Sequence, residues 1–271
     1  MNLLKDNVYK LYFKYFFPTM CAALSTSIYI LFDTIFIGQG VGSLGLTALN
    51  IALPIYSIYF GTGLLIGIGG STLMSIEKGR EREDKAQKIF TLSFVFGLIL
   101  AIIYTIVGFV FLEEIAVILG ATKEVLPLVK EYMIVVVFGT IPFVMGSILA
   151  PFIRADKAPK KAMFAVIFSG VLNIILDYIF VFPLKMGMKG AAIATVFSYT
   201  ISFLILLTHL LSKNNTLKFK SGFYKLTNVI RIIKCGLPSL FIEVSLGFVI
   251  FIFNIQILKI IGDDGVTAYS I

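Results

Sequence analysis

The stretch KYFFPTMCAALSTSIYILFDTIFIGQGVGSLGLTALNI, residues 14–51, has a second copy in this chain, KCGLPSLFIEVSLGFVIFIFNIQILKIIGDDGVTAYSI, at 234–271. Aligned without a gap at an offset of 220 residues, about eleven of roughly thirty-eight positions are identical. A long internal repeat in an apolar chain is typical of transporters built from two equivalent halves. We therefore expect one half of such a protein followed by the start of the next, with a C-terminal truncation at Ile271.

The composition indicates a membrane protein. Apolar residues make up 58% of the 271 residues and charged residues 14%, whereas soluble domains carry about 25% charged residues. We expect an all-α polytopic membrane protein with a six-helix N-lobe at 1–211, a basic cytoplasmic linker at 212–231, and the seventh helix and the start of the eighth, in a C-lobe, at 232–271. The expected spans, each near or above the ~20 residues that cross a bilayer, are 12–37, 46–76, 89–112, 127–153, 162–183, 187–212 and 232–261.

Lysine and arginine alternate between loops. The N-terminus and the loops 77–88, 154–161 and 212–234 hold roughly eighteen of the 23 basic residues. The positive-inside rule then predicts a cytoplasmic N-terminus and a location in the cell membrane. The net charge of +8 follows from this topology, so we expect no nucleic-acid partner.

The sequence contains no motif of a metal site or of an intramembrane protease. His209, the one histidine, lies near the end of the sixth span, where we interpret it as an interfacial residue that builds no metal site by itself. No GxSG or GxGD string of an intramembrane protease occurs. We expect no enzymatic activity, no cofactor, and no metal beyond a Na⁺ ion at the acids described next.

Three carboxylates, Asp33, Asp177 and Glu243, lie within expected spans, where each costs several kcal/mol unless it faces the bundle interior or water. At ~1.5 Å per residue, Asp33 and Asp177 lie roughly 6–9 Å below the outer surface. Asn173 precedes Asp177 by one helical turn, on the same face. These residues predict a functional site, although both acids could instead cap helices or face the outer headgroups.

Two further polar residues reach the same depth, Tyr132 on the fourth span and Thr195 on the sixth. Two carboxylates in one layer repel each other when both are ionised, so the layer favours binding of H⁺ or Na⁺. The sequence leaves open which ion it is. We predict a cation site formed by Asp33, Asn173, Asp177, Thr195 and Tyr132.

Glu243 differs from these acids because it lies near the middle of the seventh span, after Pro238. The repeat pairs Asp33 with Phe253 and Glu243 with Ala23, so the scaffold is duplicated but the acids are not. We predict that Glu243 contributes a substrate site or a second cation site.

The second span is rich in glycine, which permits both close helix packing and local bending. Packing and gating are both open interpretations for these glycines and for the prolines of the repeat. The residues are Gly61, Gly63, Gly67, Gly69, Gly70, Pro18 and Pro238.

Four strings carrying these residues resemble the multidrug and toxic compound extrusion (MATE) family, in particular its Gram-positive multidrug export type. They are DTIFIGQGVGSLGLTALNIALPI at 33–55, RADKAPKKAM at 154–163, NIILDYIFVFPLKMGMKGAAIAT at 173–195 and GLPSLFIEVSLGF at 236–248. The third string is the most specific. In the second string, Lys157 replaces a glycine that is usual after the acidic residue.

This resemblance implies a transporter of two six-helix lobes that exchanges H⁺ or Na⁺ for lipophilic, often cationic drugs, and that is a monomer when full length. It also implies a cation site at Asp33, Asn173 and Asp177, with Thr195 and Tyr132 matching less closely, and a seventh-helix acid at Glu243. Its partners would be small drugs and the lipid bilayer. Two alternatives remain, a flippase for lipid-linked oligosaccharides and a truncated membrane scaffold that transports nothing.

Overall fold

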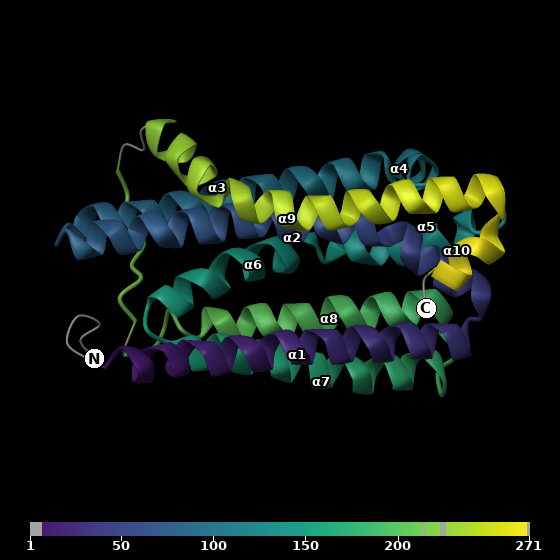
Figure 1. Cartoon of the computed structure of the whole chain (residues 1–271), viewed down its shortest axis with the longest axis horizontal. Helices are drawn as coiled ribbons and strands as arrows, with labels where there is room; N and C mark the ends of the chain where they lie inside the picture. The colour runs from purple at the N-terminus through teal and green to yellow at the C-terminus, as the bar shows by residue number, and fades with distance from the viewer. Residues whose placement is uncertain (1–6, 214, 223–225, 270–271) are drawn as a thin grey trace.

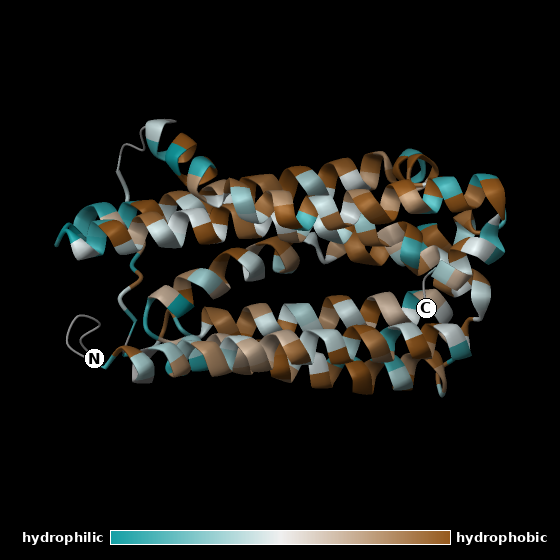
Figure 2. Cartoon of the chain, viewed as in Figure 1, coloured by the Kyte–Doolittle hydropathy of each residue, from teal (hydrophilic) through white to brown (hydrophobic). Residues whose placement is uncertain are grey.

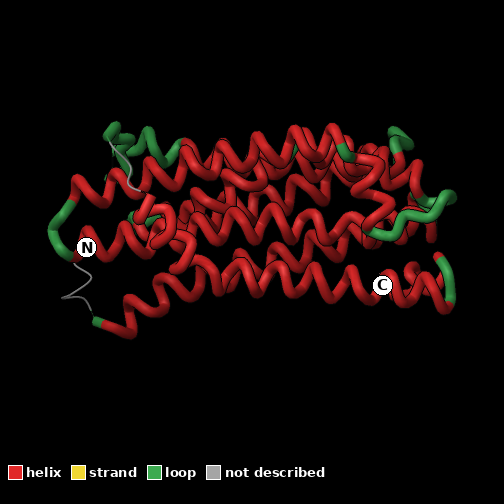
Figure 3. Tube along the Cα trace, turned by 90° about the horizontal axis from the view of Figure 1, so that it is seen from above, coloured by secondary structure: helices red, strands yellow, loops and turns green. Residues whose placement is uncertain are grey.

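The computed structural model describes residues 7–213, 215–222 and 226–269. Over these residues the chain is helical and contains no strand (Figure 3). The remaining residues of the expected N-lobe, linker and eighth span lie outside the described part. The helices are α1 (Val8–Gly40), α2 (Ser43–Gly79), α3 (Glu83–Val110), α4 (Leu112–Ile118), α5 (Leu126–Phe138), α6 (Thr140–Ala155), α7 (Pro159–Val181), α8 (Gly187–Leu207), α9 (Leu226–Ile260) and α10 (Asp263–Tyr269).

The described helices have the length and composition that a bilayer requires. Six are long and apolar enough to cross a membrane, or seven if the bent pair α5 and α6 counts as one span. Figure 2 shows apolar residues along the length of the helices and hydrophilic residues gathered toward the two ends of the bundle. The predicted all-α polytopic membrane fold is confirmed.

The fourth span is not the continuous helix expected over 127–153. It consists of α5 and α6, which meet at Gly139 with a bend of 53°. Pro142 lies in the first turn of α6, where its ring would clash with the carbonyl of Phe138 in an unbroken helix and its nitrogen has no hydrogen to donate. The helix therefore restarts at Thr140.

The segment between α8 and α9 also differs from the expected one. Helix α8 ends at Leu207, so the last five residues of the sixth expected span, 187–212, lie beyond it. Helix α9 begins at Leu226, within the expected linker 212–231. The division of the chain into two lobes stays a prediction.

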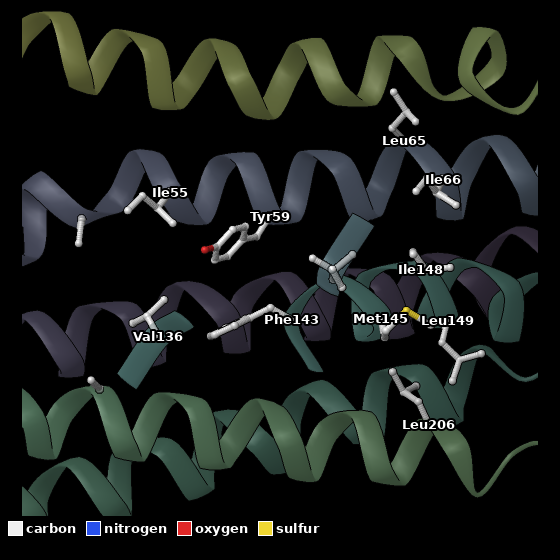
Figure 4. Packing of buried hydrophobic residues seen from close by; sticks show 14 of the residues in the cluster. Ile55, Tyr59, Leu65, Ile66, Val136, Phe143, Met145, Ile148, Leu149 and Leu206 are labelled. Carbon is white, nitrogen blue, oxygen red and sulfur yellow. The ribbon is translucent and has the colours of Figure 1, made fainter. Parts of the chain in front are cut away.

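Two layers of helices enclose the bent pair. In Figure 1, α2, α3 and α9 run together along one side, and α1, α7 and α8 along the other, with α6 between them. Figure 4 shows side chains of α6, among them Phe143 and Ile148, between Ile66 of α2 and Leu206 of α8. This buried apolar contact joins the layers.

The glycines of α2 face three different neighbours. Gly61 and Gly69 face α9, Gly63 and Gly67 face α6, and Gly70 faces α3 and α6. A methyl group added at any of them would lie 3.3 Å or less from a neighbouring atom, for example 2.1 Å from the Ile232 carbonyl oxygen at Gly69. These glycines thus permit close packing of α2. A role in gating stays a prediction.

Both prolines of the repeat lie inside continuous helices, Pro18 in α1 and Pro238 in α9. In Figure 1 the first turns of α9 are inclined to the rest of that helix. Proline explains a bend at this position because its ring displaces the carbonyl four residues earlier.

The two copies of the repeat share a turn. Gly42 and Gly262, 220 residues apart, have φ of 94° and 86° and precede α2 and α10. Three residues later, Gly45 and Gly265 each contact the helix before the turn. The hydroxyl groups of Thr47 and Thr267 lie 2.7 Å apart, so equivalent residues of the repeat meet each other.

Replacement of Gly236 by alanine tests the contact between α9 and α2. The new methyl group would lie 1.8 Å from the carbonyl oxygen of Leu65, so we expect a loss of about 1–3 kcal/mol of unfolding free energy. Denaturant unfolding in micelles measures it. Gly146→Ala is the control, since nothing lies within 4 Å of its added methyl group. Equal stability of the two variants would contradict the close packing of α2 and α9.

Candidate functional site

A cavity of about 300 Å³ lies inside the bundle, between α1, α2, α5, α8 and α9. Four of the predicted site residues line it, Asp33, Tyr132, Thr195 and Glu243. The other two, Asn173 and Asp177, are buried on α7 and do not line it. The lining residues are Tyr29, Ile30, Asp33, Thr34, Leu49, Asn50, Leu53, Tyr56, Ser57, Phe60, Tyr132, Thr195, Tyr199, Glu243, Leu246 and Ile250.

The two outer-layer acids meet between α1 and α7. Their carboxyl groups are near enough to share a hydrogen bond when one of them is protonated. Asp177 is fully buried, and Asp33 lines the cavity. The two acids that the sequence predicts at one depth are therefore neighbours.

Asn173 contributes an amide to this contact, one helical turn before Asp177 and close enough to interact with its carboxyl group. Its Nδ2 donates to the hydroxyl oxygen of Thr195, 3.3 Å away on α8. The Asn173 oxygen is buried and accepts no hydrogen bond among the described residues. The amide therefore joins α7 to α8 and leaves its oxygen available.

Buried oxygens without donors are the main property of the site. Within the described part of the chain, both oxygens of Asp177, Oδ1 of Asp33 and Oδ1 of Asn173 accept no hydrogen bond. An ionised carboxylate in such a place is unstable unless a proton or a cation compensates it. A group of acceptor oxygens from two acids and one amide offers that compensation to a proton or a small hard cation.

Four tyrosines line the cavity together with Asp33 and Glu243. The hydroxyl of Tyr132 lies 3.0 Å from that of Tyr56, and the hydroxyl of Tyr29 lies 2.5 Å from that of Tyr199. The rings of Phe60 and Tyr199 approach to 5.5 Å. The cavity thus combines hydroxyl groups with aromatic faces.

Glu243 enters the same cavity from α9. Helix α9 approaches α2 closely at this level because Gly61 has no side chain, and an added methyl group there would lie 3.3 Å from the Glu243 Cβ. The acid that stands apart in the seventh span therefore shares one cavity with Asp33. The roles of these acids stay predictions.

The sequence interpretation missed Tyr29, Tyr56, Tyr199, Phe60 and Asn50, because aromatic residues in apolar helices are core residues by default. For two of them, the spacing in the sequence could have indicated a position at the site. Tyr29 lies four residues before Asp33, and Tyr199 four residues after Thr195, so each shares a helix face with a predicted site residue.

Membrane-length helices around a cavity lined by acids and aromatic residues define a polytopic membrane protein with an internal chamber. The sequence profile of the MatE family matches residues 18–179, more than half of the chain. The chain belongs to the MatE family.

Relatives and solved structures agree with this assignment. The multidrug export protein MepA of Staphylococcus saprophyticus is 31% identical over 98% of this chain, and MepA of Staphylococcus aureus strain MRSA252 is 30% identical over the same share. This chain spans 59% of the length of each.

Among solved structures, the MATE multidrug transporter DinF-BH, solved as a complex, matches with a TM-score of 0.91 and 28% identity, over 99% of this chain and 60% of that one. An inward-facing multidrug resistance MATE family transporter of the MOP superfamily matches with a TM-score of 0.85 and 25% identity, over 90% of this chain and 56% of that one.

Replacement of Thr195 by valine tests the buried bond between α7 and α8. Valine keeps the shape but removes the acceptor for Asn173, so we expect a loss of about 1–3 kcal/mol of unfolding free energy because a buried amide loses its partner. Denaturant unfolding in micelles measures it. Thr195→Ser keeps the hydroxyl and should remain near the parent protein. If valine and serine are equally stable, the bond does not hold the two helices.

Proposed function

We propose that this chain serves cation-coupled efflux, in which H⁺ or Na⁺ is exchanged for lipophilic, cationic compounds. The observation that carries the proposal is the buried carboxyl group of Asp177, whose oxygens accept no hydrogen bond among the described residues, beside Asp33 at the cavity wall. Such a pair gains stability when it binds a proton or a cation.

Coupling follows from the position of Asp33. It belongs to α1 and faces both the buried Asp177 and the cavity. Ion binding would remove the repulsion between the two carboxylates and alter how α1 packs on α7. Substrate and ion would then compete for the cavity side of Asp33, so that each weakens the binding of the other, as antiport needs.

The cavity lining supports a cationic, aromatic substrate. Two acids, Asp33 and Glu243, face it together with four tyrosines and Phe60, and none of the lining residues is Lys or Arg. Tyrosine and phenylalanine faces attract cations. A flippase for a pyrophosphate-linked lipid would need basic residues instead. The similar proteins carry the names of multidrug export proteins and multidrug transporters.

The setting of this activity is the cell membrane, with the N-terminus in the cytoplasm, as the distribution of basic residues indicates. We infer transport rather than chemical conversion, because the similar proteins are named as exporters. We also infer no cofactor beyond the coupling ion, and a monomer when full length.

Ethidium uptake into proteoliposomes tests the proposal. The chain, in vesicles carrying an imposed pH or Na⁺ gradient, should accumulate ethidium, and removal of the gradient of the coupling ion should stop it. Asp177→Asn, which keeps the shape but cannot exchange a proton or hold a cation strongly, should reduce uptake to the level of protein-free vesicles. Glu124→Gln, at an exposed position, is the matched control.

Each result separates the alternatives. Uptake that depends on only one gradient identifies H⁺ or Na⁺. Uptake that is unchanged in Asp177→Asn would refute this site as the coupling site. A parent chain that takes up no ethidium under either gradient would favour a membrane scaffold that transports nothing.

A further inference from the structure

The segment between α8 and α9 is held along the end of the bundle without forming a helix. Figure 1 shows it rising from the end of α8 toward the layer of α2 and α3. We call the described residues 209–213 and 215–220 the strap. Its contacts were not expected from the sequence, where this segment is a basic linker.

Asp156, just after α6, is the centre of these contacts. Its Oδ2 lies 2.9 Å from Nε2 of His209 and accepts a hydrogen bond of 3.0 Å from the backbone N–H of Thr216. Its Oδ1 pairs with Nζ of Lys78 at 3.2 Å and accepts a hydrogen bond from the Thr216 hydroxyl. The carboxylate therefore joins α2, α6 and the strap.

His209 lies just beyond the end of α8, and its side chain is buried against Asp156, a contact that the sequence did not predict. The side chains of His209 and Asp156 are only 3% and 2% exposed. Burial alone would raise the pKa of Asp156, but hydrogen bonds from Thr216 and His209 and the charge of Lys78 outweigh it, so the pKa lies below its ordinary value. The cluster thus holds an ionised carboxylate.

A helix-ending motif places Asp156 toward the strap. The N–H of Ala158 donates to the carbonyl of Ile153, and that of Lys157 to the carbonyl of Arg154, the two bonds of a Schellman motif. Lys157 has φ of 65°, in the left-handed region that glycine adopts most easily. Lys157, which replaces the glycine usual in the second string, is therefore the residue at which the backbone turns after α6.

Further contacts continue the strap onto α3. Leu217 is 2% exposed, and the ring of Phe219 lies 5.2 Å from that of Phe90 and 5.1 Å from that of Phe94. The N–H of Lys220 donates to the hydroxyl oxygen of Thr91 at 2.9 Å. The strap is fixed over its length rather than only at Asp156.

We propose that Asp156 is a positioning residue that fastens the strap to the bundle and so sets where α9 enters it. Helix α9 begins six residues after Lys220 and packs along α2, the helix that carries Lys78. A fastened strap limits how far the start of α9 can move from the bundle. The effect of Asp156 on transport rests on the proposed function, but its effect on the position of the strap does not.

Trypsin cleavage after Lys218 and Lys220 tests the fastening in the full chain in micelles. Asp156→Asn and Thr216→Val should raise the cleavage rate about tenfold, the factor expected for one lost hydrogen bond to a charged group. Thr216→Ser keeps the hydroxyl and should cleave like the parent chain. If Thr216→Val is cleaved at the parent rate, the proposal is overturned. The comparison of Thr216→Val with Thr216→Ser decides this even if Asp156→Asn fails to fold.

Ethidium transport tests the positioning role. Thr216→Val should slow ethidium uptake while equilibrium ethidium binding stays unchanged, because the strap residues do not line the cavity, and Thr216→Ser should restore the rate. Normal uptake by a variant with a cleavable strap would overturn the positioning role. If the parent chain takes up no ethidium, the proposed function fails, and the cleavage rates still decide the fastening.

Discussion

The close approach of helices to α2 is the constraint on which the structure depends. In a bilayer, helices gain little from hiding apolar surface and associate through close contact and buried polar bonds. Glycines of α2 provide that contact toward α3, α6 and α9. The cavity is lined by α2 and α9, which pack closely at its level, and by α1, α5 and α8. Rigid packing and an open chamber are therefore properties of the same helix.

The site itself is defined by incomplete hydrogen bonding. Most buried polar groups in proteins have partners, and this chain satisfies the rule at Asp156, which has four. At Asp177 the rule fails, because neither oxygen accepts a bond among the described residues. The two buried aspartates therefore differ, because the protein supplies donors to the carboxylate of Asp156 and none of the described residues donates to that of Asp177.

Much of this could be predicted from the sequence, since length and hydropathy locate apolar helices and acids inside them are rare enough to be informative. Depth along the helices placed Asp33 and Asp177 in the same layer of the membrane. The sequence could not show that Asn173 bonds to Thr195, that Tyr56 and Phe60 face a cavity, or that Pro142 breaks the fourth span, because these depend on which side of each helix meets a neighbour. The pairing of His209 with Asp156 could not be predicted for the same reason, as the two residues are distant in the chain.

The contact between Thr47 and Thr267 has a geometric consequence. Equivalent residues of two copies that are related by a rotation come close together only near the rotation axis. The contact between Thr47 and Thr267 therefore marks the place where such an axis would pass, at the end of the bundle where α2 and α10 begin. A side chain near such an axis contacts the equivalent side chain of the other copy of the repeat. The threonine pair is self-complementary, since each hydroxyl can both donate and accept.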